Sequence, residues 1–267
     1  MTLAVCATPI GNLEDVTLRV LRELGEADLV LCEDTRHTRI LLRRHGIEAR
    51  LLSLHAHNEA QRTASVLPRL LGGERVALAS DAGLPAISDP GGRLVAAALA
   101  HGVEVTVLPG PSAVETALVA SGLASGRYQF VGYLPRGAGA LRALWTELAR
   151  WPHAVVAFES PRRLPLALST LAQVLPERPA AVCRELTKRF EEVARGLPAE
   201  LAARFAEPPK GEISLVLGAA PAEERDEGPA LAAMLELVGA GVPRRGAAEL
   251  VARLTGVPRN RLYGASL

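Results

Sequence analysis

Short β-rich runs alternate with longer helical patterns over residues 1–118, and this alternation constrains the fold more than any other feature of the chain. The sequence predicts strands at 3–7, 28–32, 50–53, 75–79 and 103–107. Helical periodicity lies between them, at 13–24, 35–45, 59–71 and 92–101. Strands that alternate with helices of this length are typical of βαβ units. We therefore expect an α/β domain over residues 1–118, with a mostly parallel sheet covered by helices on its faces.

Residues 119–222 show a different pattern, in which predicted strands outnumber predicted helices. Strands are predicted at 128–133, 154–158, 180–184, 191–196 and 212–217. Helices are predicted at 140–150, 161–174 and 198–205. The strands at 180–184 and 191–196 are too close in the chain for a helical crossover, so we expect them to pair antiparallel. The segment predicts a second, mixed α/β domain.

A small tail follows at residues 223–267, where a charged and proline-bounded segment at 221–229 predicts a linker. Three short helical patterns in the tail, separated by turns that contain glycine and proline, predict a helix-turn-helix-like unit. From residue 242 onward the charged residues are five arginines and one glutamate: Arg244, Arg245, Arg253, Arg259, Arg261 and Glu249. This local basic charge is typical of a surface that contacts nucleic acid phosphates.

The composition excludes several classes of protein. With 49% apolar residues and a net charge of +1, the 267-residue chain can bury a large core and need not be disordered. No apolar run approaches the roughly 18 residues that a membrane span needs, and the N-terminus has no signal-peptide pattern. Cys6, Cys32 and Cys183 lie far apart in apolar stretches, which predicts buried, reduced thiols. We therefore expect a cytoplasmic protein without membrane association.

One pair of histidines has the spacing of metal ligands. His55 and His57 would lie on one face of a strand, but no third ligand is near them in the sequence. We expect no metal, and instead a hydrogen-bonding role together with Asn58 and Glu59.

Four loops that follow predicted strands are candidates for a ligand site, because ligands of open parallel sheets bind beyond the carboxyl ends of the strands. They span 8–12, 33–36, 80–92 and 109–113, and three of them are rich in glycine and proline. Such residues let a ligand approach the backbone closely, although each could also serve only as a tight turn. The phosphate-binding patterns G-x-G-x-x-G and G-x-x-x-x-G-K-[ST] are absent, which favours a nucleoside ligand without a phosphate tail.

Eight motifs carry a resemblance to a known family. In chain order they are TPIGNLEDVT, EDTR, SDAGLPAISDPG, PGPSAVETAL, GYLPR, FESPRRL, CRELTKRFEE and KGE. They resemble the bacterial ribosomal RNA methyltransferases that 2′-O-methylate a cytidine in the decoding region of small-subunit (16S) rRNA. The resemblance covers roughly residues 3–218, and several members of that family carry a similar helix-turn-helix tail.

The resemblance implies a fold, a cofactor and partners. The family belongs to the tetrapyrrole-methylase superfamily of class III methyltransferases, which have a two-domain α/β fold and use S-adenosylmethionine. It implies a homodimer in the bacterial cytoplasm, with the methyl donor in the cleft between the two domains. The expected substrate is small-subunit rRNA, either naked or in the assembled small subunit.

The same resemblance implies which residues hold the methyl donor. Carried over by motif, the donor-binding candidates are Ile10, Asp81, Ile87, Ser112, Ala113, Phe158 and Gly211. Most of them lie in the loops that follow predicted strands, so backbone groups are expected to make many of the contacts.

Methyl transfer to a ribose hydroxyl sets further demands, because the 2′-oxygen is a weak nucleophile until a base removes its proton or a cation stabilises its alkoxide. The catalytic candidates are Glu33, Asp34, Arg36, Glu185 and Lys188, with Asp89 and Glu159 as further carboxylates. Lys188, one of two lysines in the chain, would stabilise the oxyanion, with Glu185 or Glu33 orienting it or accepting the proton. Each could instead belong to a structural ion pair, and the sequence alone does not select one general base.

Arginines near the predicted cleft and in the tail are candidates for contacts to RNA phosphates. They are Arg136, Arg162 and Arg163 after strands of the second domain, and Arg244, Arg245, Arg259 and Arg261 in the tail. Solvated surface arginines, or a tail that packs on the catalytic body, are the alternatives.

Two other functions stay open at this point. A tetrapyrrole carbon methyltransferase on the same fold would need a wide apolar bowl for a macrocycle. A ligand-sensing DNA-binding regulator would use the tail as its recognition unit. The EDTR and HAHNE strings, together with the basic tail, favour RNA methylation.

Overall fold

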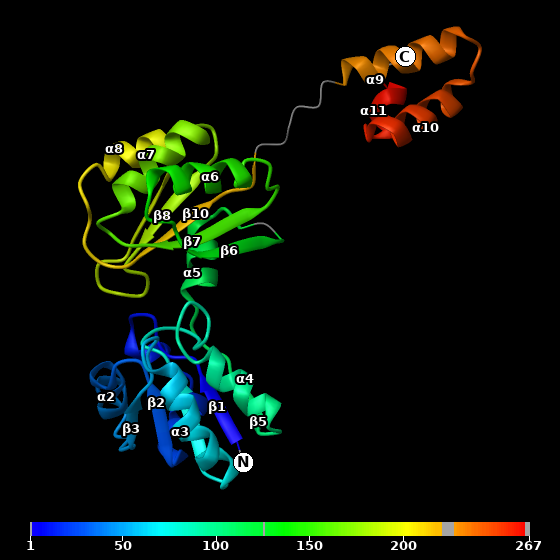
Figure 1. Cartoon of the computed structure of the whole chain (residues 1–267). Helices are drawn as coiled ribbons and strands as arrows, with labels where there is room; N and C mark the ends of the chain where they lie inside the picture. The colour runs from blue at the N-terminus through cyan, green and yellow to red at the C-terminus, as the bar shows by residue number, and fades with distance from the viewer. Residues whose placement is uncertain (1, 125, 221–226, 265–267) are drawn as a thin grey trace. The chain divides into compact units, whose positions relative to one another are not determined.

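The computed structural model describes residues 2–124, 126–220 and 227–264 (Figure 1). The chain divides into two compact units, residues 1–220 and residues 221–267. The first unit contains two sheets, and the second is helical. Most of the predicted linker, residues 221–226, lies outside the described residues.

The first sheet is parallel throughout, as predicted, with the strand order β3-β2-β4-β1-β5. Its strands are β1 (Thr2–Cys6), β2 (Leu29–Cys32), β3 (Leu51–Ser53), β4 (Arg75–Ala79) and β5 (Glu104–Leu108). Because β1 lies between β4 and β5, the loops that follow these three strands leave the same edge of the sheet side by side.

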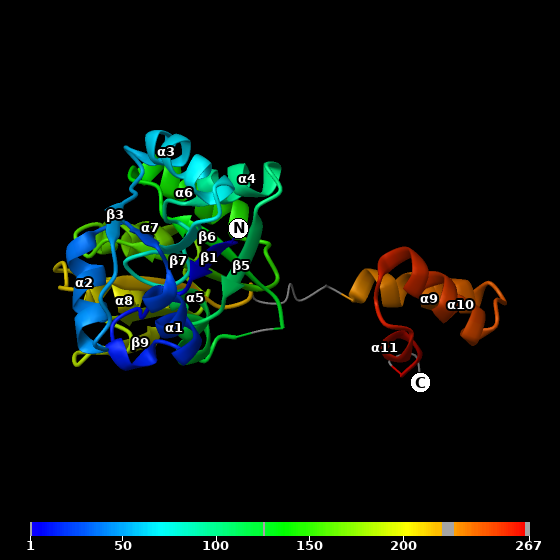
Figure 2. The same ribbon diagram turned by 90° about the horizontal axis from the view of Figure 1, so that it is seen from below.

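Helices cover both faces of this sheet (Figure 2). They are α1 (Leu18–Glu26) and α2 (Thr35–Arg44) on one face, and α3 (Glu59–Leu71) and α4 (Gly92–Ala100) on the other. The helix predicted at 13–24 is divided into a short 3-10 turn, η1 (Leu13–Asp15), and α1. The division has a local cause, since the Thr17 side chain accepts a hydrogen bond from the Val20 amide and so starts α1.

The second sheet is mixed, with the order β6-β7-β10-β8-β9. Its strands are β6 (Tyr128–Tyr133), β7 (Ala154–Glu159), β8 (Ala180–Arg184), β9 (Glu192–Gly196) and β10 (Ile213–Leu217). β6 and β7 are parallel and the other pairs are antiparallel. The predicted antiparallel pairing of 180–184 with 191–196 is confirmed.

Helices also cover both faces of the second sheet. α6 (Ala138–Leu148), α7 (Leu164–Val174) and α8 (Pro198–Arg204) enclose one core around Trp145, and α5 (Ala113–Ser121) packs on the opposite face. In Figure 1, α5 lies between this sheet and the first one. The sequence did not predict α5, because its first turn follows the string Pro109-Gly-Pro-Ser, which favours a loop.

The helical unit consists of α9 (Gly228–Gly239), α10 (Arg244–Thr255) and α11 (Arg259–Gly264). They pack around a small apolar cluster that includes Met234, Ala247, Val251 and Leu262. The three helices predicted in the tail are confirmed, and α10 ends at Gly256, whose φ of 72° suits glycine. In the described part of the chain, every helix is too short or too polar to cross a membrane.

Candidate functional site

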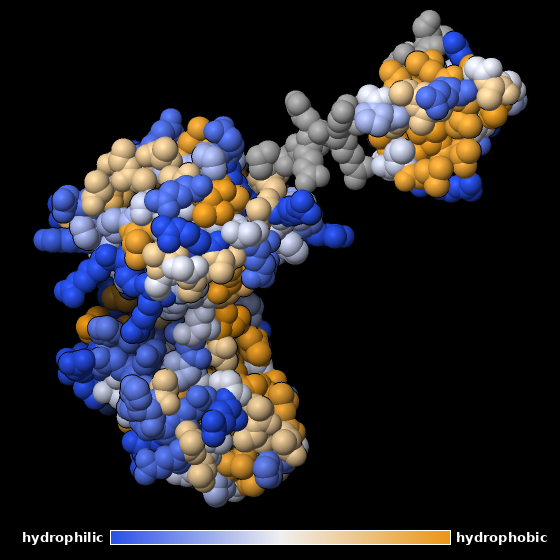
Figure 3. Space-filling model, turned by 45° about the horizontal axis from the view of Figure 1, so that its top comes forward, coloured by the Kyte–Doolittle hydropathy of each residue, from blue (hydrophilic) through white to orange (hydrophobic). Residues whose placement is uncertain are grey.

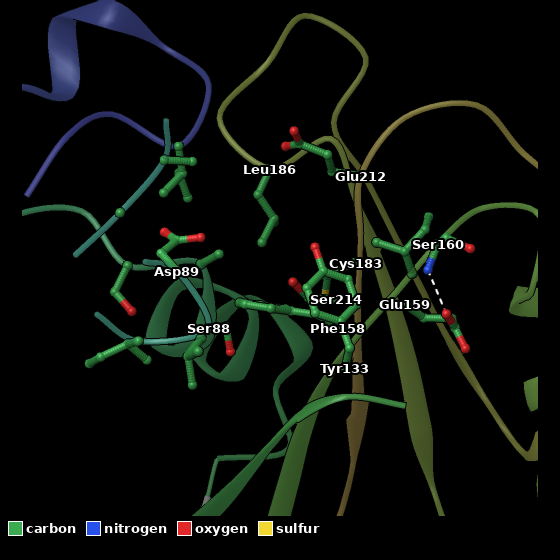
Figure 4. Close-up of a pocket in the computed structure, with 18 of the residues that line it drawn as sticks. Ser88, Asp89, Tyr133, Phe158, Glu159, Ser160, Cys183, Leu186, Glu212 and Ser214 are labelled. Atoms are coloured by element: carbon green, nitrogen blue, oxygen red, sulfur yellow. Dashed lines mark hydrogen bonds between the residues drawn. The ribbon is translucent and has the colours of Figure 1, made fainter. Parts of the chain in front are cut away.

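A cavity of about 320 Å³ lies between the loops of the first sheet and the strand ends of the second (Figure 4). Its walls come from both sheets and from the start of α5. They comprise Ile10, 82–84, 87–89, 112–114, Tyr133, 158–161, Cys183, Leu186 and 211–214. Three of the four loops that the sequence indicated as ligand-site candidates contribute to the walls, namely 8–12, 80–92 and 109–113. The fourth loop, 33–36, does not line the cavity.

The loops after β1 and β4 are joined by backbone hydrogen bonds. The Thr8 amide donates to the Gly83 carbonyl at 2.8 Å, and the Gly83 amide donates back to the Thr8 carbonyl at 3.0 Å. The buried Thr8 hydroxyl donates to the Ser80 carbonyl at 3.0 Å. Gly83 has a φ of 75°, which residues with a Cβ rarely adopt. This bridge fixes one wall of the cavity.

The loop 80–92 brings a carboxylate into the cavity. Ala86 and Ser88 have positive φ values of 69° and 61°, which are strained for residues other than glycine. This backbone places Asp89 on the wall, with its carboxyl group turned toward the cavity (Figure 4). Strain of this kind is often retained where it positions a functional group.

Burial is the main reason that the pKa of Asp89 rises to about 6, and the negative charges of Glu33 and Asp81 add to the effect. Burial is also the main cause of a raised pKa of Glu33, and the negative charge of Asp81 is the second cause. Glu33 does not line the cavity, but its negative charge raises the pKa of Asp89.

The second sheet supplies an aromatic wall and a buried carboxyl. Phe158 makes edge-to-face contacts with Phe130 and Tyr133, at centroid distances of 4.9 and 5.6 Å. Glu159 Oε1 accepts a hydrogen bond from the Ser160 amide at 2.6 Å and forms an ion pair with Arg163. Burial raises the pKa of Glu159 in spite of these contacts, and its Oε2 has no hydrogen-bond partner among the described residues.

Lys188 is held at the rim by two carboxylates. Its Nζ lies 2.9 Å from Glu185 Oε1 and 2.8 Å from Glu212 Oε2, and Glu212 lines the cavity. Burial lowers the pKa of Lys188, but the hydrogen bonds to Glu212 and Glu185 outweigh it, so the pKa lies above its usual value and the ammonium is charged at neutral pH. Lys188 and Glu185 themselves lie just outside the cavity wall.

The segment 185–191, between β8 and β9, is fixed against the loop after β1. The Asn12 amide donates to the Thr187 hydroxyl at 3.0 Å. A Cβ added to Gly11 would lie 2.7 Å from that hydroxyl oxygen and 2.9 Å from the Leu186 carbonyl oxygen. Glycine at position 11 therefore permits the close approach of the two loops.

Asp34, Arg36 and Asp81 form a separate group. Asp34 caps α2 through the Arg36 amide and binds the Arg36 guanidinium, whose side chain is 83% exposed. Asp81 accepts a hydrogen bond from the Asp34 amide at 3.0 Å and lies 3.2 Å from His37 Nδ1. These contacts tie the start of α2 to the loop after β4.

The predicted donor-binding residues lie along the cavity with one exception. Ile10, Ile87, Ser112, Ala113, Phe158 and Gly211 are on its walls. Asp81 is not, because its carboxylate is engaged with Asp34 and His37. None of the five catalytic candidates lines the wall, whereas Asp89, Glu159 and Glu212 do. Sequence reasoning did not single out Tyr133, Cys183, Leu186 or Ser214, although Tyr133 and Leu186 lie within the GYLPR and CRELTKRFEE motifs.

The candidate RNA-binding arginines are mostly at the surface. Arg136, Arg162 and Arg244 are exposed, and Arg163 is paired with the buried Glu159. In the helical unit, Arg259 and Arg245 share Glu249 at 2.8 and 3.5 Å, and Arg261 pairs with Glu227 at 2.9 Å.

The cysteines match the prediction, whereas of the predicted hydrogen bonds around the histidine pair only those between His55 and Asn58 are present in the described residues. All three cysteines are buried free thiols. The His55 amide donates to Asn58 Oδ1 at 2.8 Å, and Asn58 Nδ2 lies 3.1 Å from His55 Nε2. Glu59 accepts hydrogen bonds instead from the Gly91 and Arg93 amides, both at 2.9 Å. No group of three or more metal-ligating side chains occurs among the described residues.

Comparisons with known families match both units of the chain. The family of tetrapyrrole (corrin/porphyrin) methylases matches residues 2–202, and the RsmI C-terminal HTH domain matches residues 225–267.

Curated relatives match nearly the whole length. The ribosomal RNA small subunit methyltransferase I of Mesorhizobium japonicum is 45% identical over 98% of this chain and 90% of its own. The protein of the same name from Xylella fastidiosa is 45% identical over 98% of each chain.

Solved structures confirm the predicted tetrapyrrole-methylase fold. A uroporphyrin-III-C-methyltransferase from Thermus thermophilus has a TM-score of 0.58 at 21% identity, covering 91% of this chain and 99% of that one. A structure of the Thermus enzyme complexed with S-adenyl homocysteine has a TM-score of 0.57 at 22% identity, covering 82% and 97%. The methyltransferase CobJ has a TM-score of 0.62 at 21% identity, covering 82% and 93%.

Proposed function

The chain belongs to the tetrapyrrole methylase family, and from this premise we propose that it transfers a methyl group from S-adenosylmethionine to the ribose 2′-oxygen of a cytidine in the decoding region of 16S rRNA. The observation that carries the proposal is the cavity that three of the four candidate loops line together. The curated relatives that match both units are named as ribosomal RNA methyltransferases, which supports RNA as the substrate.

The residues around the cavity fit such a donor. Ile10, Val114 and Phe158 offer apolar surface for an adenine ring. The carboxyl groups of Asp89 and Glu212 face the same space and suit a ligand with sulfonium and ammonium charges. When bound, S-adenosylmethionine supplies an already activated methyl group, so the protein has to position the 2′-oxygen and remove its proton.

We assign the removal of the proton to Asp89. Its carboxyl group faces the cavity, and a pKa of about 6 suits a base that works near neutral pH. Glu33 acts through Asp89 as a positioning residue, since its charge helps to set that pKa. Asp34 and Arg36 are left with a structural role at the start of α2.

Lys188 supplies the positive charge in this proposal. Its ammonium group is next to Glu212 on the cavity wall, and from there it would stabilise a developing alkoxide at the mouth of the cavity. Glu185 holds the ammonium from the other side and keeps it at the rim.

A homodimer and a basic RNA-binding tail complete the proposal, for a protein that works in the cytoplasm. One flank of the first unit carries a band of hydrophobic residues (Figure 3). The edge strand β5 exposes half of Val107, and Leu99 is 59% exposed on α4, which packs against β5. A second copy would cover such an edge.

The test is methyl transfer from labelled S-adenosylmethionine to small ribosomal subunits, and to their naked RNA, from cells that lack the gene. We expect one label per RNA, at a cytidine that resists alkaline cleavage because its 2′-oxygen is methylated. Label in an added tetrapyrrole but not in RNA would overturn the proposal. Tight binding of duplex DNA without any methyl transfer would favour a regulator instead.

A further inference from the structure

Two successive turns make up the segment between β8 and β9, and they present their central residues in different directions. The first turn is closed by the Lys188 amide, which donates to the Glu185 carbonyl at 3.0 Å. Its central residue Leu186 is buried on the cavity wall. The second turn is closed by the Glu191 amide, which donates to the Lys188 carbonyl at 3.1 Å. Its central residues, Arg189 and Phe190, are exposed.

The rest of the segment is firmly braced, and the two exposed residues take no part in the bracing. The Thr187 amide donates to Glu191 Oε2 at 2.6 Å, and the Glu185 amide donates to the Glu212 carbonyl at 3.0 Å. Lys188 adds its two ion pairs. The segment 185–191 is therefore held in position without the side chains of Arg189 and Phe190, which leaves both available for a ligand.

Phe190 is one of few aromatic residues, since Phe, Trp and Tyr make up only 3% of the chain. It is 65% exposed, close to the 62% of Tyr133 on the cavity wall, whereas Trp145 and Phe205 are buried in the core of the second sheet. The Arg189 guanidinium lies 5.5 Å from the centroid of the Phe190 ring. No carboxylate pairs with Arg189 in the part of the chain that the structure describes.

An exposed aromatic ring with an adjacent guanidinium has the chemistry that binds an unpaired nucleotide. Proteins recognise single-stranded RNA by stacking bases on aromatic side chains or on arginine, while arginine also contacts phosphate. Phe190 is four residues after Leu186, so its Cα lies within about 14 Å of a residue on the cavity wall. This distance is short enough for a nucleotide next to the one being methylated to reach Phe190.

We propose that Arg189 and Phe190 form a stacking site for an unpaired base of the RNA substrate, close to the methylated nucleotide. Phe190 stacks on the base and Arg189 contacts the adjoining phosphate. The inference rests on the proposed function, because an RNA substrate places a nucleotide chain at the mouth of the cavity.

The test compares Phe190→Leu with Phe190→Trp in the full-length protein, with small ribosomal subunits lacking the modification as substrate. Leucine keeps the apolar character and removes the aromatic face, whereas tryptophan keeps that face. Stacking of one base is worth about 1–3 kcal/mol, so we expect Phe190→Leu to raise the KM for the subunits about 5- to 150-fold at nearly unchanged kcat. Phe190→Trp should stay close to wild type, and its tryptophan fluorescence should be quenched by the RNA.

Control variants separate base stacking from other roles of the segment 185–191. Leu18→Ala removes another highly exposed apolar side chain and should leave the KM unchanged. Arg189→Gln should weaken RNA binding and lower its salt dependence. The affinity for S-adenosylmethionine should be unchanged in all variants.

Several outcomes would overturn the inference. They are a Phe190→Leu variant with the wild-type KM, an equal loss in Phe190→Leu and Phe190→Trp, and a change of oligomeric state in light scattering, which would make Phe190 a subunit contact. If the wild-type protein methylates RNA and Phe190→Leu leaves the KM unchanged, only the stacking site is refuted. Wild-type protein that methylates no RNA refutes the proposed function itself.

Discussion

At the scale of single residues, the site depends on carboxyl groups whose ionisation is shifted by their surroundings. Among the carboxyl groups on the cavity wall, Asp89 has a raised pKa, because burial and the charges of Glu33 and Asp81 all favour its protonated form. The sequence identified Asp89 and Glu33 as acidic residues after strands. It could not show that Asp89 lines the cavity while Glu33 does not, since the position of Asp89 depends on the strained backbone at Ala86 and Ser88.

The pH dependence of turnover follows from this shift. A base must be ionised to accept a proton, so kcat should rise as the pH passes through about 6 and level off above about 7. Glu33→Gln removes a negative charge, lowers the pKa of Asp89 and moves the rise to lower pH. Asp89→Asn should lower kcat about 10²- to 10⁴-fold. Measured kcat profiles decide both points: a Glu33→Gln profile identical to that of the wild type would contradict the effect of Glu33 on Asp89, and a wild-type kcat in Asp89→Asn would remove Asp89 from this role.

Lys188 can be tested by separating donor binding from turnover. Lys188→Ala removes the cation next to Glu212 and should lower kcat about 10²- to 10³-fold, while calorimetry shows unchanged affinity for S-adenosylmethionine. Arg142→Ala is the charge-matched control, because Arg142 is an exposed side chain of α6 that donates a hydrogen bond to Gln173 of α7. An equal loss of donor binding and turnover would exclude Lys188 from the chemistry.

At the scale of elements, the strands of both sheets were predictable because their apolar runs are short and bounded by turn residues. The helix α5 was not predictable, because its own apolar residues are distributed around most of its circumference and give no clear one-sided periodicity. The approach of the segment 185–191 to the loop after β1 was also hidden, since no sequence pattern reports a contact across 175 residues.

Gly11 tests that approach directly. Gly11→Ala places a Cβ 2.9 Å from the Leu186 carbonyl oxygen, so the two loops must separate. Overpacking of this kind costs about 1–3 kcal/mol, and we expect a lower unfolding free energy and weaker donor binding. Gly139→Ala, in α6 with no atom within 4 Å of the added Cβ, is the matched control and should be neutral or stabilising. Chemical denaturation measures both, and equal behaviour of the two variants would contradict the close packing.

At the scale of the whole molecule, the cavity depends on both sheets of the first unit. Each sheet supplies part of the wall, and neither encloses the cavity alone. The individual sheets follow from local sequence patterns, but their convergence does not, because it depends on contacts between distant loops such as the hydrogen bond from the Asn12 amide to the Thr187 hydroxyl. The family resemblance supplied what these patterns could not, namely the expectation that the methyl donor binds between the two parts of the chain. The boundaries at 118 and 222 remain predictions for the extent of independently folding domains.

The central claim is that this shared cavity holds S-adenosylmethionine, and calorimetric titration of the purified protein tests it most directly. We predict saturable binding of S-adenosylmethionine and of its demethylated product, with one site per chain. Ala113→Phe, which fills the cavity wall at the start of α5, should abolish the heat, and Ala140→Phe, on the exposed side of α6, should preserve it. The absence of binding by the folded wild-type protein, or full binding by Ala113→Phe, would contradict the account.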